Sequence, residues 1–194
     1  MDDPAIVLAS ASPRRRALLE QIGVAHRIHP VSVDERLRPD EAKEVYVLRV
    51  ALAKARAGWS AAGVELDRPV LSADTVVAAE GEVLGKPADR AQGLAMLARL
   101  SGRAHRVLTA VALVHGGRHA TRLSASTVHM RRIAPAERER YWASGEPADK
   151  AGAYAVQGKA AVFVTHIEGS YSGIMGLPLF ETAELLTAFG VEVL

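Results

Sequence analysis

The chain has 194 residues, of which 49% are hydrophobic and 24% charged, and its 24 basic and 22 acidic side chains give a formal net charge of +2. This composition can bury a sizeable core and excludes intrinsic disorder, while the small net charge argues against nucleic acid or an anionic membrane as partner. The absence of cysteine excludes disulfides, thiolate metal sites and a cysteine nucleophile. No apolar stretch approaches the roughly 20 residues of a membrane helix, and no secretory signal is evident, so we expect a cytoplasmic protein.

The first half of the chain alternates between short apolar runs and helical patterns. Expected elements are strands at 5–9, 26–31, 69–73 and 75–79 and helices at 13–23 and 40–61. The first helix is expected to be capped by Ser12, to begin at Pro13 and to end at Gly23. The apolar stripe expected on the long helix consists of Val45, Leu48, Leu52 and Ala55.

The second half contains a predicted hairpin between helices. Glu80-Gly81-Glu82 indicates a turn, and Gly116-Gly117 is expected to join two long strands. Expected elements are helices at 87–100, 135–143 and 179–188 and strands at 105–114, 118–131 and 160–167. The whole pattern predicts an α/β fold with a mixed twisted sheet and flanking helices, in a single domain over 1–194 without a separate linker. Polar glycine-flanked loops suggest two lobes around a cleft.

The segment Ser10-Ala-Ser-Pro-Arg-Arg-Arg16 follows the first strand and opens a helix. A helix N-terminus carries free N–H groups and a partial positive charge, which favour a bound phosphate. Arginines in the first turn oppose the helix dipole, so their presence makes better sense if an anion binds there. A capped surface helix with solvated arginines is the alternative, and the segment alone does not decide between the two.

Asp74 interrupts a run that otherwise has the pattern of a buried strand, Ser72-Ala-Asp-Thr-Val-Val77. A buried carboxylate needs a partner, a metal ion or a raised pKa. Such positions are often functional, although a hydrogen-bonded structural aspartate is nearly as common. Asp74 is therefore a candidate catalytic residue.

Two further loops carry candidate binding residues. Leu84-Gly-Lys-Pro87 lacks the spacing of a phosphate-binding P-loop, but Lys86 could still reach a phosphate as a point charge. The glycine-rich loop 145–158 contains Gln157, whose amide could pair with a nucleobase edge through its donor and acceptor groups. In isolation each is also compatible with an ordinary structural loop.

Taken together, these segments resemble the Maf family of nucleoside triphosphate pyrophosphatases, also called septum formation inhibitor proteins. The matching stretches occur in the family's order and cover nearly the whole chain: Leu8-Ala-Ser-Ala-Ser-Pro-Arg-Arg15, Val33-Asp-Glu35, Ala51-Leu-Ala-Lys-Ala55, Ala73-Asp-Thr75, Leu84-Gly-Lys-Pro87, Asp149-Lys-Ala-Gly-Ala-Tyr154, Gln157-Gly158 and Gly176-Leu-Pro-Leu179. One such motif is weak evidence, whereas the ordered set is highly specific.

The resemblance implies a fold like that of the inosine triphosphate pyrophosphatases, a divalent cation (Mg²⁺ or Mn²⁺), a homodimer, and hydrolysis of a nucleoside triphosphate to monophosphate and pyrophosphate. It makes Asp74 the proton acceptor and links Arg14, Thr75 and Gln157 to base selection. These three residues match the branch associated with dTTP and UTP, whereas a branch acting on 7-methyl-GTP carries other residues, including tryptophan in place of the first arginine. The departures are mild: Ser72 stands where glycine is common, and Ala155-Val156 replaces Gly-Ile.

The hypothesis assigns further residues to the reaction. Glu35 is expected as a second carboxylate that binds the metal or the water, with Asp74 as the other metal ligand. The phosphate-binding residues expected around them are Ser10, Arg14, Arg15, Lys54 and Lys86. Modified pyrimidine nucleotides are further possible substrates, and nucleotide pool cleaning and cell division arrest are both open as cellular roles.

Two other functional classes remain open from the sequence alone. The chain could be a nucleotide-sensing regulator of division, although Asp74 and the set of cationic residues argue against an inactive enzyme. It could also bind nucleic acid through Arg14 to Arg16, Arg131 and Arg132. The small net charge and an aromatic content of only 5% weigh against that second alternative.

Overall fold

The computed structural model describes residues 4–63 and 67–193, which divide into two compact units. The first unit comprises residues 1–74, 109–124 and 176–194, and the second comprises residues 75–108 and 125–175. The single domain predicted over 1–194 also covers residues 1–3, 64–66 and 194, and these lie outside the described residues. The single domain and the cleft between two lobes stay predictions.

Seven strands form one mixed sheet in the described part of the chain. They are β1 (Ile6–Leu8), β2 (His26–Ile28), β3 (Val70–Ala79), β4 (Glu82–Leu84), β5 (Ala104–His115), β6 (Arg118–Met130) and β7 (Val164–Glu168). Their order is β2-β1-β3-β5-β6-β7, with β4 paired to β3. β1 runs parallel to both β2 and β3, whereas β4 and β7 pair antiparallel with β3 and β6. The predicted α/β fold with a mixed sheet is confirmed.

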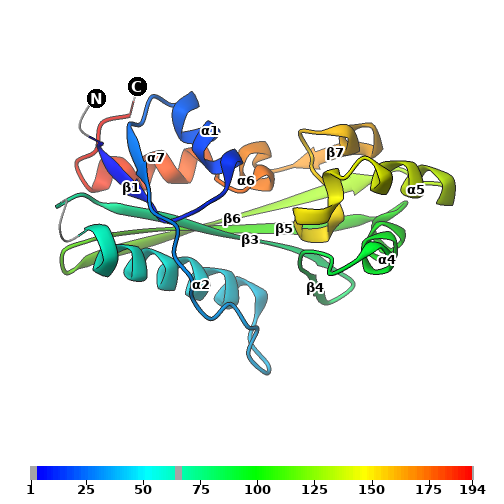
Figure 1. The fold of residues 1–194 in the computed structure, drawn as a ribbon, viewed down its shortest axis with the longest axis horizontal. Helices are drawn as coiled ribbons and strands as arrows, with labels where there is room; N and C mark the ends of the chain where they lie inside the picture. Colours follow the sequence, from blue (N-terminus) through cyan, green and yellow to red (C-terminus); the bar gives the residue numbers. More distant parts are fainter. Residues whose placement is uncertain (1–3, 64–66, 194) are drawn as a thin grey trace. The chain divides into compact units, whose positions relative to one another are not determined.

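In the described residues of the first unit, three α-helices cover the strands. They are α1 (Pro13–Gln21), α2 (Lys43–Gly58) and α7 (Leu179–Ala188), and α2 continues into the π-helical turn η1 (Trp59–Gly63). Figure 1 shows α2 on one face of the strands and α1 and α7 on the other. The fully buried side chains of β1, α1 and α7 include Ile6, Leu8, Leu19, Leu185 and Leu186. Buried apolar area of this kind is the main stabilising contribution to the unit.

The buried face of α2 differs from the predicted stripe. Val45 is 55% exposed and Leu48 and Leu52 are only partly buried, whereas the residues that are buried are Tyr46, Val47, Val50, Ala51, Ala55 and Gly58. A Cβ atom at Gly58 would lie 2.8 Å from the Val70 side chain and 2.9 Å from Ala9. The helix therefore approaches the sheet with its small residues, and the larger Leu48 and Leu52 lie beside the contact.

The strands predicted on either side of Asp74 are one continuous strand. β3 has ten residues, nine of them buried, and Asp74 lies within it. Splitting the run at Asp74 was wrong because a strand accommodates a buried carboxylate when cations neutralise it, as described below. The turn predicted at Glu80-Gly81 is confirmed, and it leads into β4, a three-residue strand that the sequence reading missed.

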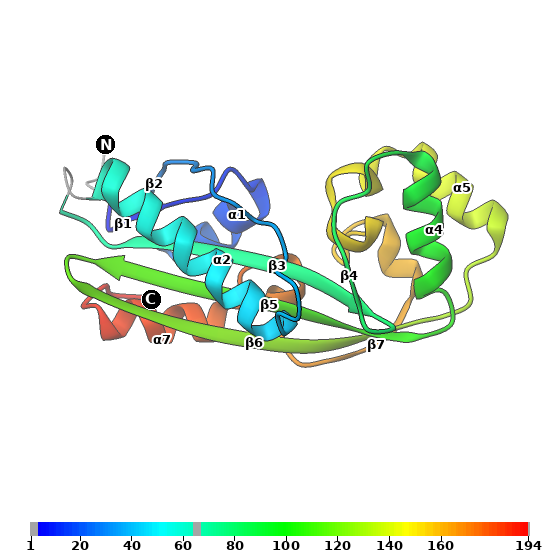
Figure 2. The same ribbon diagram turned by 90° about the horizontal axis from the view of Figure 1, so that it is seen from below.

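The second unit combines three α-helices with several short 3₁₀ turns. The helices are α4 (Arg90–Leu100), α5 (Pro135–Ala143) and the short α6 (Tyr171–Met175), and the 3₁₀ turns are η2 (Glu146–Asp149), η3 (Ala151–Ala153) and η4 (Lys159–Phe163). Figure 2 shows α4 and α5 as neighbours. The core beneath them includes Leu97, Leu100, Tyr141, Tyr154 and Phe163.

Several predicted boundaries in this unit need correction. The helix over 135–143 is confirmed, but α4 begins at Arg90 rather than 87, because the Asp89 side chain accepts a hydrogen bond from the Gln92 N–H at 2.8 Å and caps the helix there. The strand predicted at 160–167 begins only at Val164, after the 3₁₀ turn η4. The described helices include none that is both long and apolar enough to cross a bilayer.

Candidate active site

Arg15, in the first turn of α1, donates hydrogen bonds to two oxygen atoms. The Arg15 Nη1 donates to Ser10 Oγ at 3.1 Å and its Nε donates to the Gly176 carbonyl oxygen at 2.8 Å. Ser10 Oγ also accepts from the Ser12 N–H at 3.2 Å. Ser12 is the N-cap residue and Pro13 the first helical residue, as predicted, but the Ser12 side chain makes no capping hydrogen bond.

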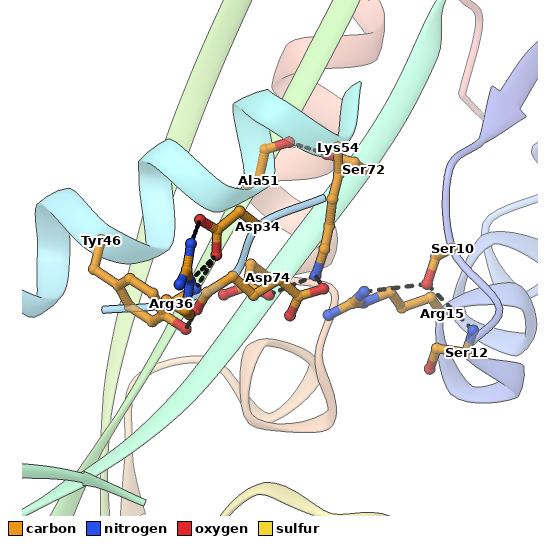
Figure 3. Close-up of polar contacts among 11 residues, drawn as sticks. Ser10, Ser12, Arg15, Asp34, Arg36, Tyr46, Ala51, Lys54, Ser72 and Asp74 are labelled. Carbon is orange, nitrogen blue, oxygen red and sulfur yellow. Dashed lines mark hydrogen bonds and ion pairs between the residues drawn. The ribbon is translucent and has the colours of Figure 1, made fainter. Parts of the chain in front are cut away.

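Lys54 joins two carboxylates that are distant in the sequence. Its Nζ lies 2.9 Å from Asp74 Oδ1 and 2.9 Å from Glu35 Oε1. The Lys54 and Asp74 side chains are 12% and 9% exposed, whereas the Glu35 side chain is 50% exposed. In Figure 3 the guanidinium of Arg15 also points toward Asp74. We call Arg15, Glu35, Lys54 and Asp74 the charged cluster.

Burial and charge act in opposite directions on Asp74. Burial raises the pKa of its carboxyl group above the usual 3.8, and Glu35 raises it further, while Lys54 and Arg15 favour the ionised form and limit the rise. Burial likewise lowers the pKa of Arg15, and the neighbouring Asp74 partly offsets that effect. A carboxylate with a raised pKa beside two cations is a suitable proton acceptor, and the cations are suited to an anionic ligand.

The backbone around Glu35 is fixed by side chains of α2. The Tyr46 hydroxyl donates to the Glu35 carbonyl oxygen at 2.8 Å, and Arg49 Nη2 donates to the Arg36 carbonyl oxygen at 3.0 Å. Arg36 in turn binds the Asp34 carboxylate through two nitrogens. These hydrogen bonds hold the loop that carries Glu35 against α2, and Figure 3 shows Tyr46 and Arg36 among the residues involved.

β3 and α2 are tied together next to the charged cluster. The Ser72 hydroxyl donates to the Ala51 carbonyl oxygen at 2.5 Å, one turn before Lys54 on the helix. Ser72 is fully buried, so this hydrogen bond removes an unsatisfied hydroxyl from the core. It also sets the distance between the two elements that carry Lys54 and Asp74.

Comparison with known proteins identifies the relatives of this chain. The family model described as "Maf-like protein" matches residues 5–189. The chain belongs to the Maf family. It is 59% identical over 192 residues to the dTTP/UTP pyrophosphatase of Alkalilimnicola ehrlichii, covering 97% of this chain and 95% of that protein. It is 51% identical to the dTTP/UTP pyrophosphatase of Chromobacterium violaceum, covering 99% and 98%.

One solved structure is a more distant likeness to this Maf protein. It is the dITP/XTP pyrophosphatase of Mycobacterium abscessus, with a TM-score of 0.41 and 22% sequence identity. That likeness covers 66% of this chain and 75% of the other.

The remaining predicted site residues of this Maf protein differ in their burial and in the unit to which they belong. Arg14 is partly buried beside the cluster residue Arg15, whereas Arg16 is exposed and pairs with Glu20 at 3.3 Å. Thr75, Lys86 and Gln157 belong to the second unit: Thr75 is half-buried in β3, and Lys86 and Gln157 are exposed on loops. Their participation in a common site with the charged cluster stays a prediction.

The metal ligands predicted from the sequence are two carboxylates that share a lysine. Within the described residues, 4–63 and 67–193, no group of three histidine, aspartate or glutamate side chains could hold a metal ion. One oxygen atom of Glu35 and one of Asp74 both face the position of Lys54 Nζ. Two carboxylate oxygens fit a hard cation such as Mg²⁺, which commonly completes its shell with phosphate oxygens and water.

Sequence reasoning missed the residues that support the cluster. Tyr46 and Arg49 act on the Glu35 loop, and the Ser72 hydroxyl acts on the helix backbone. Their signal was present but weak: a tyrosine and an arginine three positions apart lie on the same side of a helix. Serine at position 72, in an otherwise apolar run, was the other indication.

Proposed function

We propose that this Maf protein hydrolyses dTTP and UTP to the nucleoside monophosphate and pyrophosphate. The observation that carries the proposal is Asp74, a buried carboxylate with a raised pKa held against Lys54 and near Arg15. The substrate assignment rests on the two relatives with that activity in their names, at 59% and 51% identity over nearly the full length.

The proposed reaction is an attack of water on the α-phosphorus. The water oxygen forms a bond to that phosphorus, the bond to the α,β-bridging oxygen breaks, and pyrophosphate leaves with the bridging oxygen. Asp74 accepts the proton that the water loses. Because the position of the water and the charge on the phosphates both matter, the protein contributes orientation and positive charge more than covalent chemistry.

The cationic residues are assigned to the triphosphate. Arg14 and Arg15 lie at the N-terminal end of α1, where the helix dipole adds to their charge, and Lys54 approaches from α2. Lys86 and Ser10 complete the proposed set. Glu35 and Asp74 are the residues that would hold a divalent cation, and such a cation, when bound, supplies positive charge to the phosphate oxygens.

Base selection is assigned to Gln157, with Thr75 and Arg14. Uracil and thymine share an acceptor–donor–acceptor edge, and a glutamine amide can pair with part of it. Cytosine reverses part of this pattern and leaves groups unpaired, which can discriminate strongly, whereas the 5-methyl group of thymine is worth only roughly 1–3 kcal/mol. We therefore expect both dTTP and UTP as substrates.

A panel of nucleoside triphosphates tests the proposal directly. Pyrophosphate and orthophosphate release are measured separately, with Mg²⁺ or Mn²⁺, for the wild type and for Asp74→Asn. We expect pyrophosphate release from dTTP and UTP that disappears in the variant. Preferred turnover of purine nucleotides would overturn the assignment of the base, and release of orthophosphate alone would overturn the assignment of the bond.

The proposal extends to the assembly of the protein. A homodimer is supported by the resemblance to Maf proteins, and light scattering coupled to gel filtration tests it. A mass near twice 20.7 kDa is the expected result, and a monomer at micromolar concentration would contradict it.

A further inference from the structure

The segment that carries Gln157 is a turn whose geometry depends on its two ends. We call residues 155–160 the Gln157 segment. The Gly158 N–H donates to the Ala155 carbonyl oxygen at 3.0 Å, which closes a turn around Gln157. Because Gln157 is exposed, the position of its amide follows from the backbone of this turn more than from packing of its own side chain.

Tyr141 fixes the first end of the segment. It is 4% exposed on α5, and its hydroxyl accepts a hydrogen bond from the Ala155 N–H at 3.1 Å. The same hydroxyl donates to Glu146 Oε1 at 2.7 Å. The tyrosine hydroxyl therefore links the start of the turn to a carboxylate.

Glu146 fixes the second end of the segment. Its Oε2 accepts from the Lys159 N–H at 3.0 Å, and its Oε1 lies 3.4 Å from the Ala160 N–H. These are the first two N–H groups of η4, which has no capping hydrogen bond from the side chain of its own N-cap residue. A carboxylate from a separate segment thus caps η4, where its charge also complements the positive end of the turn.

The Glu146 carboxylate is tightly packed, and its hydrogen bonds favour the charged form. A Cβ atom at Gly158 would lie 2.3 Å from Glu146 Oε2, so only glycine allows the turn to approach so closely. Burial by itself would raise the pKa of Glu146, but the hydrogen bonds from the Lys159 N–H and the Tyr141 hydroxyl outweigh it and lower the pKa. An ionised acceptor makes stronger hydrogen bonds than a neutral one.

We propose that Glu146 and Tyr141 are positioning residues for base selection, which fix both ends of the Gln157 segment and thereby set where the Gln157 amide meets the pyrimidine edge. The inference rests on the proposed function of Gln157. An amide that pairs with a base must be placed to within about 0.5 Å, and supporting hydrogen bonds provide that precision. Neither residue touches the charged cluster by any hydrogen bond that the structure describes.

The test is Glu146→Gln, which keeps the shape of the side chain but removes the charge and one acceptor oxygen. We expect KM for UTP to rise about tenfold, kcat to change little, and the preference for UTP over CTP in kcat/KM to fall about tenfold, because the lost interaction contributes to binding of substrate and transition state alike. Tyr141→Phe, which lacks only the hydroxyl, is expected to change KM and the preference in the same direction.

Glu137→Gln is the matched control in the same unit. Glu137 also accepts a backbone hydrogen bond, from the Ala134 N–H at 2.9 Å, and pairs with Arg131, but it caps α5 and lies outside the Gln157 segment. We expect this variant to lose stability without any change in the UTP to CTP preference. The two glutamate variants therefore separate a role in base selection from a general loss of folded enzyme.

Combination with Gln157→Ala decides whether the effect passes through the amide. In that background, Glu146→Gln should change neither KM nor the preference further, because the group that it positions is absent. An unchanged preference in Glu146→Gln, with only a smaller active fraction, would overturn the inference while leaving the proposed function in place. No pyrophosphate release from UTP by the wild type would overturn both.

Discussion

The charged cluster and the Gln157 segment are built by different means. In the cluster, charged side chains bind one another: Lys54 Nζ lies 2.9 Å from both Asp74 and Glu35. In the segment, side chains bind the backbone: Tyr141 accepts from the Ala155 N–H and Glu146 from the Lys159 N–H. The first arrangement tunes charge and proton affinity, whereas the second fixes the shape of a loop.

The difference indicates a division of labour between the two regions. Charge effects act over several ångströms in a partly buried site, so the cluster tolerates ligands that differ in their base. Recognition of a base edge depends on hydrogen-bond geometry, which a fixed turn supplies. We therefore expect changes in the cluster to affect kcat and changes in the segment to affect selectivity.

The largest expected effect is that of Asp74→Asn. Loss of the proton acceptor should lower kcat for UTP about 10³-fold, within the usual range for removal of a general base. Binding of the nucleotide should persist, because the cations remain. Pre-steady-state turnover and equilibrium binding measure the two separately, and normal turnover by the variant would remove Asp74 from the role of base.

A large effect on stability is expected from His105, a buried histidine that contacts Tyr154. His105 is 3% exposed and its Nε2 lies 2.8 Å from the Tyr154 hydroxyl. Burial lowers the pKa of His105 from 6.5 to about 4, so below pH 6.5 the unfolded chain binds a proton that the folded chain does not. The free energy of unfolding is therefore highest above pH 6.5, and it falls by about 3 kcal/mol as the pH decreases from 6.5 toward 4.

Denaturant unfolding of the wild type and His105→Asn across this pH range checks the prediction. The difference between their free energies of unfolding should shrink as the pH falls from 6.5 to 4. A difference that is constant over this range would show that His105 keeps its ordinary pKa in the folded state.

Glu35→Gln should produce a smaller effect, confined to the metal dependence. Removal of one proposed carboxylate ligand should raise the Mg²⁺ concentration for half-maximal rate about tenfold. Glu20→Gln is the matched control, because Glu20 is an exposed carboxylate that pairs with Arg16 and takes no part in the Glu35 loop or the charged cluster. Equal metal dependence in the two variants would contradict the role of Glu35.

The smallest expected effect is that of Arg14→Ala. Loss of one partly buried cation at the start of α1 should raise KM for UTP severalfold or alter the choice of base, with little change in stability. A substrate profile identical to that of the wild type would show that Arg14 is an ordinary surface residue.

Asp74 and Arg15 of the charged cluster could be picked out from the sequence because each occupies a position that is unfavourable for its charge. A carboxylate in an apolar run and arginines in the first turn of a helix are each unfavourable without partners, and this drew attention to Asp74 and Arg15. The structure supplies those partners, which lie up to 161 positions apart in the sequence, as for Arg15 and Gly176. The pairing itself could not be predicted, because it depends on how distant segments pack.

The support of the Gln157 segment left no such signal. Glu146 has the appearance of an ordinary loop residue, and Tyr141 that of a packing residue in a helix. Their hydrogen bonds to Ala155 and Lys159 depend on the 3₁₀ turns of this region, which have no strong hydrophobic period. For the same reason the sequence predicted a strand from 160, where the chain first forms η4.

The helices were predicted more accurately where local signals mark their ends. The predicted starts at Pro135 and Leu179 match those of α5 and α7, and Pro135 occupies the first position of its helix, where proline is favoured. Of the predicted stripe on α2, Ala55 is buried as expected, whereas Val45 is exposed and Leu48 and Leu52 are only partly buried. Close approach of that helix to the sheet instead selects Ala51, Ala55 and Gly58.

The most direct test of this division of labour compares Asp74→Asn and Gln157→Ala on UTP and CTP. Steady-state kcat and KM are measured for both nucleotides in each variant and in the wild type. We predict that Asp74→Asn loses kcat about 10³-fold for UTP, and that Gln157→Ala keeps kcat but loses most of the preference for UTP. Loss of kcat by both variants alike, or an unchanged preference in Gln157→Ala, would contradict the account.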